Sequence, residues 1–217
     1  IPPERVRAEL TSDLAHWARR HAEASTRSVR AVFGLHSDTN GRSGVWIEVR
    51  VTTPRLVDAP RSVRHVLQLA TDLRRDPLLF APPHARLMRF LAKTLPQAEP
   101  LASGTRFALK TSTINRLLDS FSDSPLTTWA EDDHAATGER GDRVTGARLR
   151  LGEVALDIVP TCRGEGTDMR ITLAARWPDG RQRPLEDVIH LPSDDELHPS
   201  LVLADGAFWR VAEEPPP

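Results

Sequence analysis

The chain has 217 residues, of which 39% are hydrophobic and 27% charged, and its formal net charge is −1. This length suffices for one domain or two small ones with a buried core, and the composition is ordinary for a globular protein. A nearly neutral chain has no overall electrostatic attraction for DNA or for anionic membranes. Since no apolar stretch reaches the length of a membrane span, we predict no membrane partner.

Cys162 is the only cysteine, so the chain cannot form an internal disulfide or a cysteine-based zinc site. A single cysteine fits a reducing compartment, which predicts a cytoplasmic location. Nearly all positive charge is arginine, because Lys93 and Lys110 are the only lysines. Two explanations stay open, a GC-rich genome that favours arginine codons and a preference for bidentate contacts to phosphates or carboxylates.

The two ends predict that the sequence belongs to a longer protein. Ile1 stands where an initiator Met is expected, and the first residues lack the pattern of a secretory signal. The last residues, 214–217, are acidic and rich in proline, which is typical of a linker.

Residues 1–98 are predicted to form a helical and hairpin region. Apolar side chains at three- and four-residue steps indicate helices, and two β-rich runs flank a stretch of turn formers. The expected elements are a helix over 3–24 (with Val6, Leu10, Leu14, Trp17 and His21 on one face), strands over 29–35 and 45–51, and helices over 63–73 and 82–95.

Residues 99–213 are predicted to form a short helix and a mostly antiparallel β meander, which makes the whole chain an α+β protein. Glycine-containing turns separate short β-rich runs. The helix is expected to begin after an N-cap at Thr111 or Ser112. The expected strands cover 107–110, 147–151, 154–161, 169–176, 188–191 and 201–211, with a polar loop over 131–142.

Several chemistries lack their sequence patterns in this chain. There is no glycine-rich loop ending in Gly-Lys-Ser/Thr, no Rossmann glycine fingerprint and no Gly-x-Ser-x-Gly elbow. We therefore predict no catalytic residue and no cofactor for this segment.

A metal-dependent hydrolase remains an alternative on three weak patterns. Two stretches, 131–134 and 194–198, group carboxylates with a histidine, but consecutive acidic residues in a loop are usually solvated. Asp38 followed by Glu48 and Arg50 resembles a nuclease motif, although arginine stands where the chemistry needs lysine.

Nucleic-acid contact is the remaining candidate activity, because paired arginines could follow a phosphate backbone. Interleaved acids, among them Asp13 and Asp72, favour ordinary solvated helix faces instead. The candidate contacts are Arg19, Arg20, Arg27, Arg30, Arg74 and Arg75.

The order of features in the second half resembles the region ahead of the motor in bacterial helicase-like ATPases of the Swi/Snf type. A short helix over 111–119 is followed by β segments at 148–153 and 170–173. The closing pattern, 203–211, contains an Asp-Gly turn, aromatic residues and an arginine. The stretch 74–80 is similar to a helix ending earlier in such regions.

This resemblance implies a non-catalytic N-terminal auxiliary region that braces or regulates a downstream motor domain of the same protein. It also implies roles in genome maintenance or phage defence, with DNA or other protein subunits as partners. None of the family's ATPase motifs falls within the chain. The alternative is a protein–protein interaction module of a multisubunit complex that does not contact nucleic acid.

Overall fold

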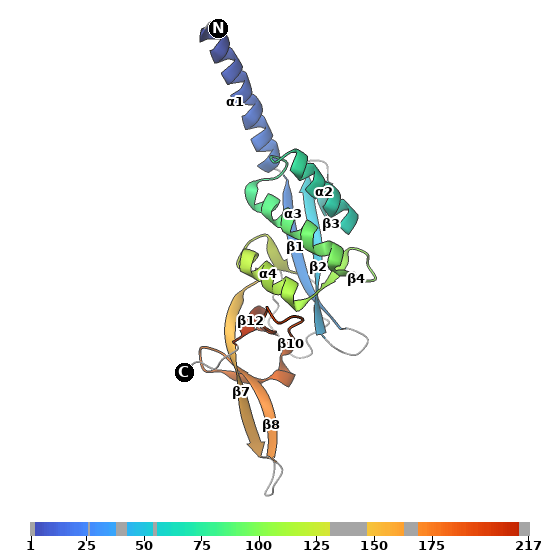
Figure 1. The fold of residues 1–217 in the computed structure, drawn as a ribbon, viewed down its shortest axis with the longest axis vertical. Coiled ribbons are helices and arrows are strands. Elements are labelled where there is room, and N and C mark those ends of the chain that lie inside the picture. Colours follow the sequence, from blue (N-terminus) through green and yellow to red (C-terminus); the bar gives the residue numbers. More distant parts are fainter. Residues whose placement is uncertain are drawn as a thin grey trace. The chain divides into compact units, whose positions relative to one another are not determined.

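The computed structural model has the α+β fold that the sequence predicts, with helices concentrated in the N-terminal half and strands in the C-terminal half (Figure 1). The predicted first helix is confirmed as α1 (Pro3–Ser25). The residues that the structure describes are 3–25, 27–37, 43–53, 56–130, 147–162 and 169–212.

The chain forms two compact units, neither of which is continuous in sequence. Unit 1 comprises Ile1–Ala31 and Glu48–Phe107, and unit 2 comprises Val32–Ile47 and Ala108–Pro217. The predicted hairpin is present as β1 (Ser28–Ser37) and β2 (Ser43–Thr53), and each unit contains one part of both strands.

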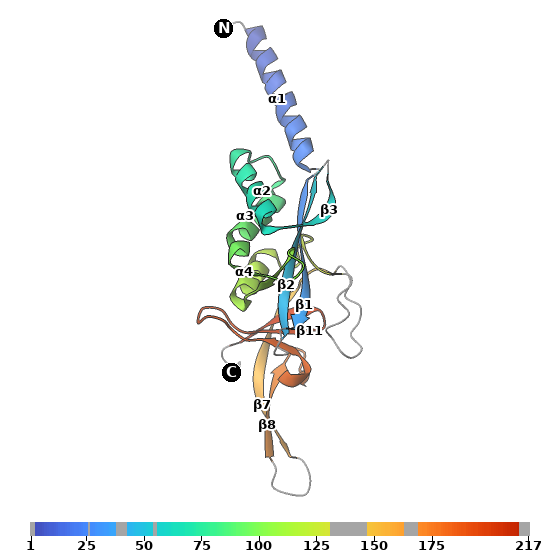
Figure 2. The same cartoon turned by 90° about the vertical axis from the view of Figure 1, so that its right-hand side faces the viewer.

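Unit 1 is a small sheet with helices on one face. Figure 2 shows α2 and α3 on the same side of the strands. Within this unit the strand order is β4-β5-β2-β1, and β3 pairs with β2. Besides α1 and the hairpin, the elements are β3 (Leu56–Arg61), α2 (Val63–Arg75), α3 (Pro82–Thr94), the 3-10 turn Leu95–Gln97, β4 (Glu99–Pro100) and β5 (Arg106–Leu109).

The core of unit 1 follows from the periods of its elements. Alternate residues of the hairpin strands point to one face, and Val29, Val49 and Val51 are buried there. The helices bury apolar side chains at three- and four-residue steps. These are Val66, Ala70 and Leu73 on α2, and Ala85, Leu87, Met88 and Leu91 on α3.

In its described residues, unit 2 contains one α-helix and a six-stranded sheet in the order β10-β11-β12-β7-β8-β9. A short strand, β6, pairs with β1 in the same unit. The elements are α4 (Thr111–Phe121), β6 (Thr127–Trp129), β7 (Leu151–Cys162), β8 (Met169–Arg176), β9 (Gln182–Pro184), the 3-10 turn Leu185–Asp187, β10 (Ile189–Leu191), β11 (Leu201–Ala204) and β12 (Ala207–Val211).

The predicted mostly antiparallel sheet is confirmed, but its strand order is not that of a simple meander. The last strand, β12, returns to lie parallel to β7, with Phe208 opposite Leu151. The predicted strand 147–151 is wrong: apart from an isolated bridge between Arg148 and Thr128, regular pairing begins only at Leu151, and β7 runs from there through Gly152. A Cβ at Gly152 would lie 2.5 Å from the ring of Trp209, so the close approach of β12 explains the glycine.

Two further predictions are wrong in detail. The N-cap of α4 is Lys110, and Thr111 and Ser112 lie inside its first turn. The strands β3, β4, β6 and β9 were not predicted, because runs of two to six residues without clear alternation carry little sequence signal.

The predicted turn at Asp205-Gly206 is confirmed. Asp205 has φ 52° and Gly206 has φ 70°, and they join β11 to β12 in a two-residue hairpin. Positive φ at both central positions matches the twist of the flanking strands, which is why Asp-Gly is favoured there. The turn places Phe208 on Trp129, with ring centroids 5.3 Å apart.

Candidate functional site

Four of the six candidate arginines gather where two helices of unit 1 end. Arg20 on α1 forms an ion pair with Asp76, the residue that caps α2 at its C-terminus. Arg74 and Arg75 form the last turn of α2 and are exposed, as is Arg19 beside Arg20. Exposed guanidinium groups carry the planar pair of N–H donors that suits phosphate oxygens.

The remaining two candidates are held by other partners. Arg27 donates from Nη1 to the carbonyl oxygen of Leu79, at 3.3 Å. Arg30 forms an ion pair with Asp58 on β3, so it belongs to the sheet and not to the helix ends. The structure therefore places Arg20 beside the end of α2, where Arg74 and Arg75 lie, and Arg27 is held by the segment that follows α2.

Sequence reasoning missed a second arginine group on the sheet of unit 1. Glu48 on β2 is 4% exposed and binds two guanidiniums. The Nε of Arg50 lies 2.8 Å from Glu48 Oε1, and the Nε of Arg106 on β5 lies 3.7 Å from Oε2. A buried carboxylate requires such pairing, because burial of an unpaired charge is strongly unfavourable.

This pairing changes the interpretation of the nuclease-like pattern. Both oxygens of Glu48 face arginines, which leaves this carboxylate poorly placed to bind a cation. The alternation of β2, with Trp46, Glu48 and Arg50 on one face, could have indicated the pair with Arg50. The contact to Arg106 depends on β5 lying beside β2, which local sequence does not reveal.

The acidic loop 194–198 is used within unit 2. Asp194 accepts hydrogen bonds from the backbone N–H of Ser112 at 2.6 Å and from its hydroxyl at 2.8 Å. It therefore caps α4 from a distance of more than eighty residues in sequence. Asp195 binds Nδ1 of His198 at 2.9 Å, and this hydrogen bond, aided by backbone N–H groups, lowers the pKa of the Asp195 carboxyl.

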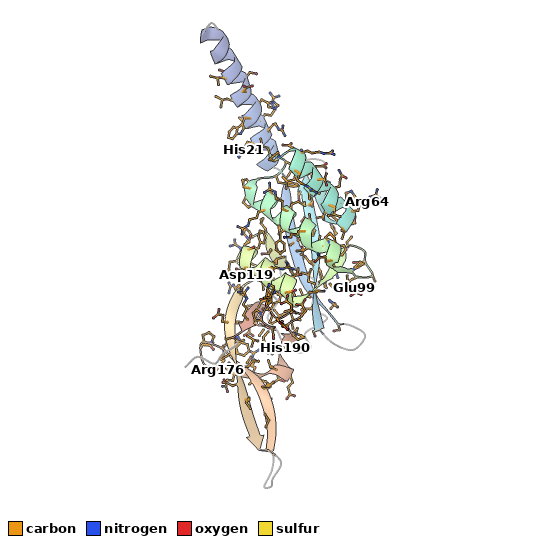
Figure 3. All side chains as sticks on the ribbon, viewed as in Figure 1. His21, Arg64, Glu99, Asp119, Arg176 and His190 are labelled. Atoms are coloured by element: carbon orange, nitrogen blue, oxygen red, sulfur yellow. The ribbon has the colours of Figure 1, made fainter. Side chains whose placement is uncertain are left out.

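A polar network fixes α4 to the end of β12. Asn115 is fully buried and donates to the carbonyl oxygen of Pro199 at 2.9 Å, while its Oδ1 accepts from Arg210 Nε at 3.0 Å. Arg210 also binds Asp119, which Figure 3 labels on α4. Every polar atom of the Asn115 side chain thus has a partner, as a buried amide needs.

Two surfaces expose apolar side chains to an unusual degree. On α1, Leu10, Leu14 and Trp17 are 57%, 64% and 54% exposed. On the β7–β8 ribbon, Ile158 and Leu173 are opposite each other and exposed. Contiguous exposed apolar side chains of this kind mark interaction surfaces.

The predicted metal-ligand patterns can be compared with the positions of the described side chains. Within the described ranges, no three His, Cys, Asp or Glu side chains are grouped to hold an ion. Asp38 and the cluster 131–134 lie outside the residues that the structure describes, as does the side chain of Cys162. In the described part of the chain, no helix is both long and apolar enough to cross a membrane.

Comparison with known protein families, curated proteins and solved structures finds no match to this chain.

Proposed function

We propose that this chain is a non-catalytic auxiliary region of a DNA-dependent helicase-like ATPase of the Swi/Snf type, which braces or regulates the motor in the cytoplasm and contacts DNA phosphates. The order of elements in unit 2 supports the proposal, since α4 precedes β7 and β8 and the β11–β12 hairpin comes last in the chain. This is the order of features on which the resemblance rests.

The single observation that carries DNA contact is the arginine group at the ends of α1 and α2. Asp76 neutralises one positive charge there, while Arg19, Arg74 and Arg75 present exposed guanidiniums. Arginines contact phosphates bidentately without reading sequence, so this surface would bind duplex DNA non-specifically.

The test measures duplex binding by fluorescence anisotropy over a range of salt concentrations. We expect a dissociation constant on the order of 10⁻⁴ to 10⁻⁶ M at physiological salt. Replacing Arg19 and Arg75 with Ala should reduce the slope of log K against log salt by about two, because each lost phosphate contact removes about one.

The matched control removes two exposed arginines elsewhere, Arg89 on α3 and Arg116 on α4. This control should leave the salt slope unchanged. An equal loss of slope in both double variants would contradict this arginine group as the DNA contact. The absence of salt-dependent binding by the original chain would contradict DNA contact altogether. ATP turnover by the chain alone would contradict a non-catalytic role.

A protein–protein interaction module is the second candidate, for example within a phage-defence complex. The exposed apolar residues of α1 and of the β7–β8 ribbon favour it specifically. Under this alternative, association with other protein subunits would persist when the arginines are replaced, and DNA would not bind.

A further inference from the structure

One side of α1 carries a stripe of exposed apolar side chains between residues 10 and 21. Leu10, Leu14 and Trp17 are each more than half exposed, and His21, labelled in Figure 3, is also exposed. The rings of Trp17 and His21 lie side by side, with centroids 5.0 Å apart. A helix with three large exposed apolar side chains on one stripe gains from covering that stripe.

The spacing of this stripe is that of a coiled-coil seam. Leu10, Leu14, Trp17 and His21 follow one another at steps of four, three and four residues. These are alternating d and a positions of two heptads, the pattern by which one helix packs lengthwise against another. This spacing therefore suits packing against a second helix better than packing against a flat surface.

We propose that α1 pairs antiparallel with α1 of a second copy of this chain. In this pairing Leu14 lies level with Trp17 of the second copy, and Leu10 lies level with His21 of the second copy. The same four layers are generated from either copy, as two-fold symmetry requires.

Charge complementarity selects this register. Asp13 and Arg20 occupy the same flank of the stripe, one heptad apart. The antiparallel pairing brings Asp13 of each copy beside Arg20 of the other, which gives two identical ion pairs. Arg20 also binds Asp76 in its own chain, and a guanidinium with five N–H donors can serve both carboxylates.

The competing arrangements are less favourable. A shift by one heptad in one direction places Asp13 against Asp13 of the second copy, and a shift in the other places Arg20 against Arg20. A parallel pair places Asp13 beside Ala18, which offers no charge. In the proposed register the opposite flank carries only the small residues Thr11 and Ala18, which allow close approach.

The pairing is weak, because two heptads bury less than the roughly 1,200 Å² of a standard interface. Association should therefore depend on concentration and appear in the upper micromolar range. The pairing uses Arg20, whereas the proposed DNA contact rests on the exposed Arg19, Arg74 and Arg75.

Sedimentation equilibrium on the chain tests the proposal up to about 1 mM, the weakest association that such a short pair is expected to show. We expect a monomer–dimer equilibrium that Leu14→Asp weakens at least about tenfold. The matched control is Leu197→Asp, which replaces an exposed leucine of unit 2 and should leave the equilibrium unchanged. Far-UV circular dichroism checks that both variants keep their helices. A strictly monomeric chain, or dimerisation insensitive to Leu14→Asp, would overturn the proposal.

A mixing experiment tests the antiparallel register. Asp13→Arg alone and Arg20→Asp alone should each self-associate less, since like charges then face each other. An equimolar mixture should recover association to within about twofold of the original chain, because both ion pairs re-form. Ser12→Arg and Arg19→Asp change charge on the outer face of α1 and serve as controls, and each alone and their mixture should associate like the original chain. Failure of the first mixture to recover would rule out this register.

Discussion

Two amphipathic helices, α1 and α4, have similar sequence patterns and opposite surroundings. Leu14 of α1 is 64% exposed, whereas Leu118 of α4 is fully buried. The difference lies in contacts from distant residues, since Asp194, Pro199 and Arg210 all bind α4 within unit 2. Periodicity therefore determines which face of a helix is apolar, and long-range contacts determine whether that face becomes core or surface.

Replacement of Leu118 with Ala should give the largest effect. It removes fully buried apolar atoms and leaves a cavity, so the free energy of unfolding of unit 2 should fall by about 2 to 5 kcal/mol. Urea unfolding followed by tryptophan fluorescence reports on this unit, because it contains Trp46, Trp129, Trp177 and Trp209. A loss below about 1 kcal/mol would mean that the core beneath α4 is not close-packed.

Asn115→Ala should give the next largest effect. Arg210 Nε and the carbonyl oxygen of Pro199 would each lose a hydrogen-bonding partner, which should lower the unfolding free energy by about 2 to 3 kcal/mol. Arg116→Ala, on the exposed side of the same helix, serves as the control in the same urea titration and should change stability little. Equal effects would show that the network does not hold α4 in place.

Asp194→Ala should have a moderate effect, since it removes the acceptor for the first turn of α4. Lost caps lower stability by about 1 kcal/mol, and up to about 2 where the site is partly buried. Thermal unfolding compared with Glu196→Ala, an exposed acid in the same loop, measures the specific part. If Glu196→Ala lowers stability as much, general loop charge rather than capping explains the change.

Leu14→Ala should have the smallest effect on stability, within about 0.5 kcal/mol in dilute solution, because its side chain is exposed. It is the counterpart of Leu118→Ala, with the same atoms removed from the other helix. A large loss, seen in chemical unfolding at low protein concentration, would show that the stripe of α1 is covered within the monomer.

The sequence predicted the helices and the hairpin well because their periods and turn residues are local. It placed the start of the strand at 154, whereas β7 begins at Leu151 and runs through Gly152, where Trp209 of β12 lies against the backbone. The helix cap from Asp194 was missed for the same reason, because a residue more than eighty positions away supplies it.

The candidate site was predicted in part. Paired arginines are visible in the sequence. The ion pair of Arg20 with Asp76 brings Arg20 to the end of α2, whose last turn contains Arg74 and Arg75. The group of Arg50 and Arg106 around Glu48 requires knowledge of which strands are neighbours, which no local pattern provides. Whether these surfaces bind DNA stays a prediction.

Hydrogen exchange measured by mass spectrometry at low and high protein concentration tests the central claim most directly, namely that α1 is a docking helix and α4 a structural one. We expect strong protection of α4 amides at both concentrations, and protection of α1 amides that rises as copies associate. Protection of α1 that equals that of α4 in dilute solution, or that does not change with concentration, would contradict the account.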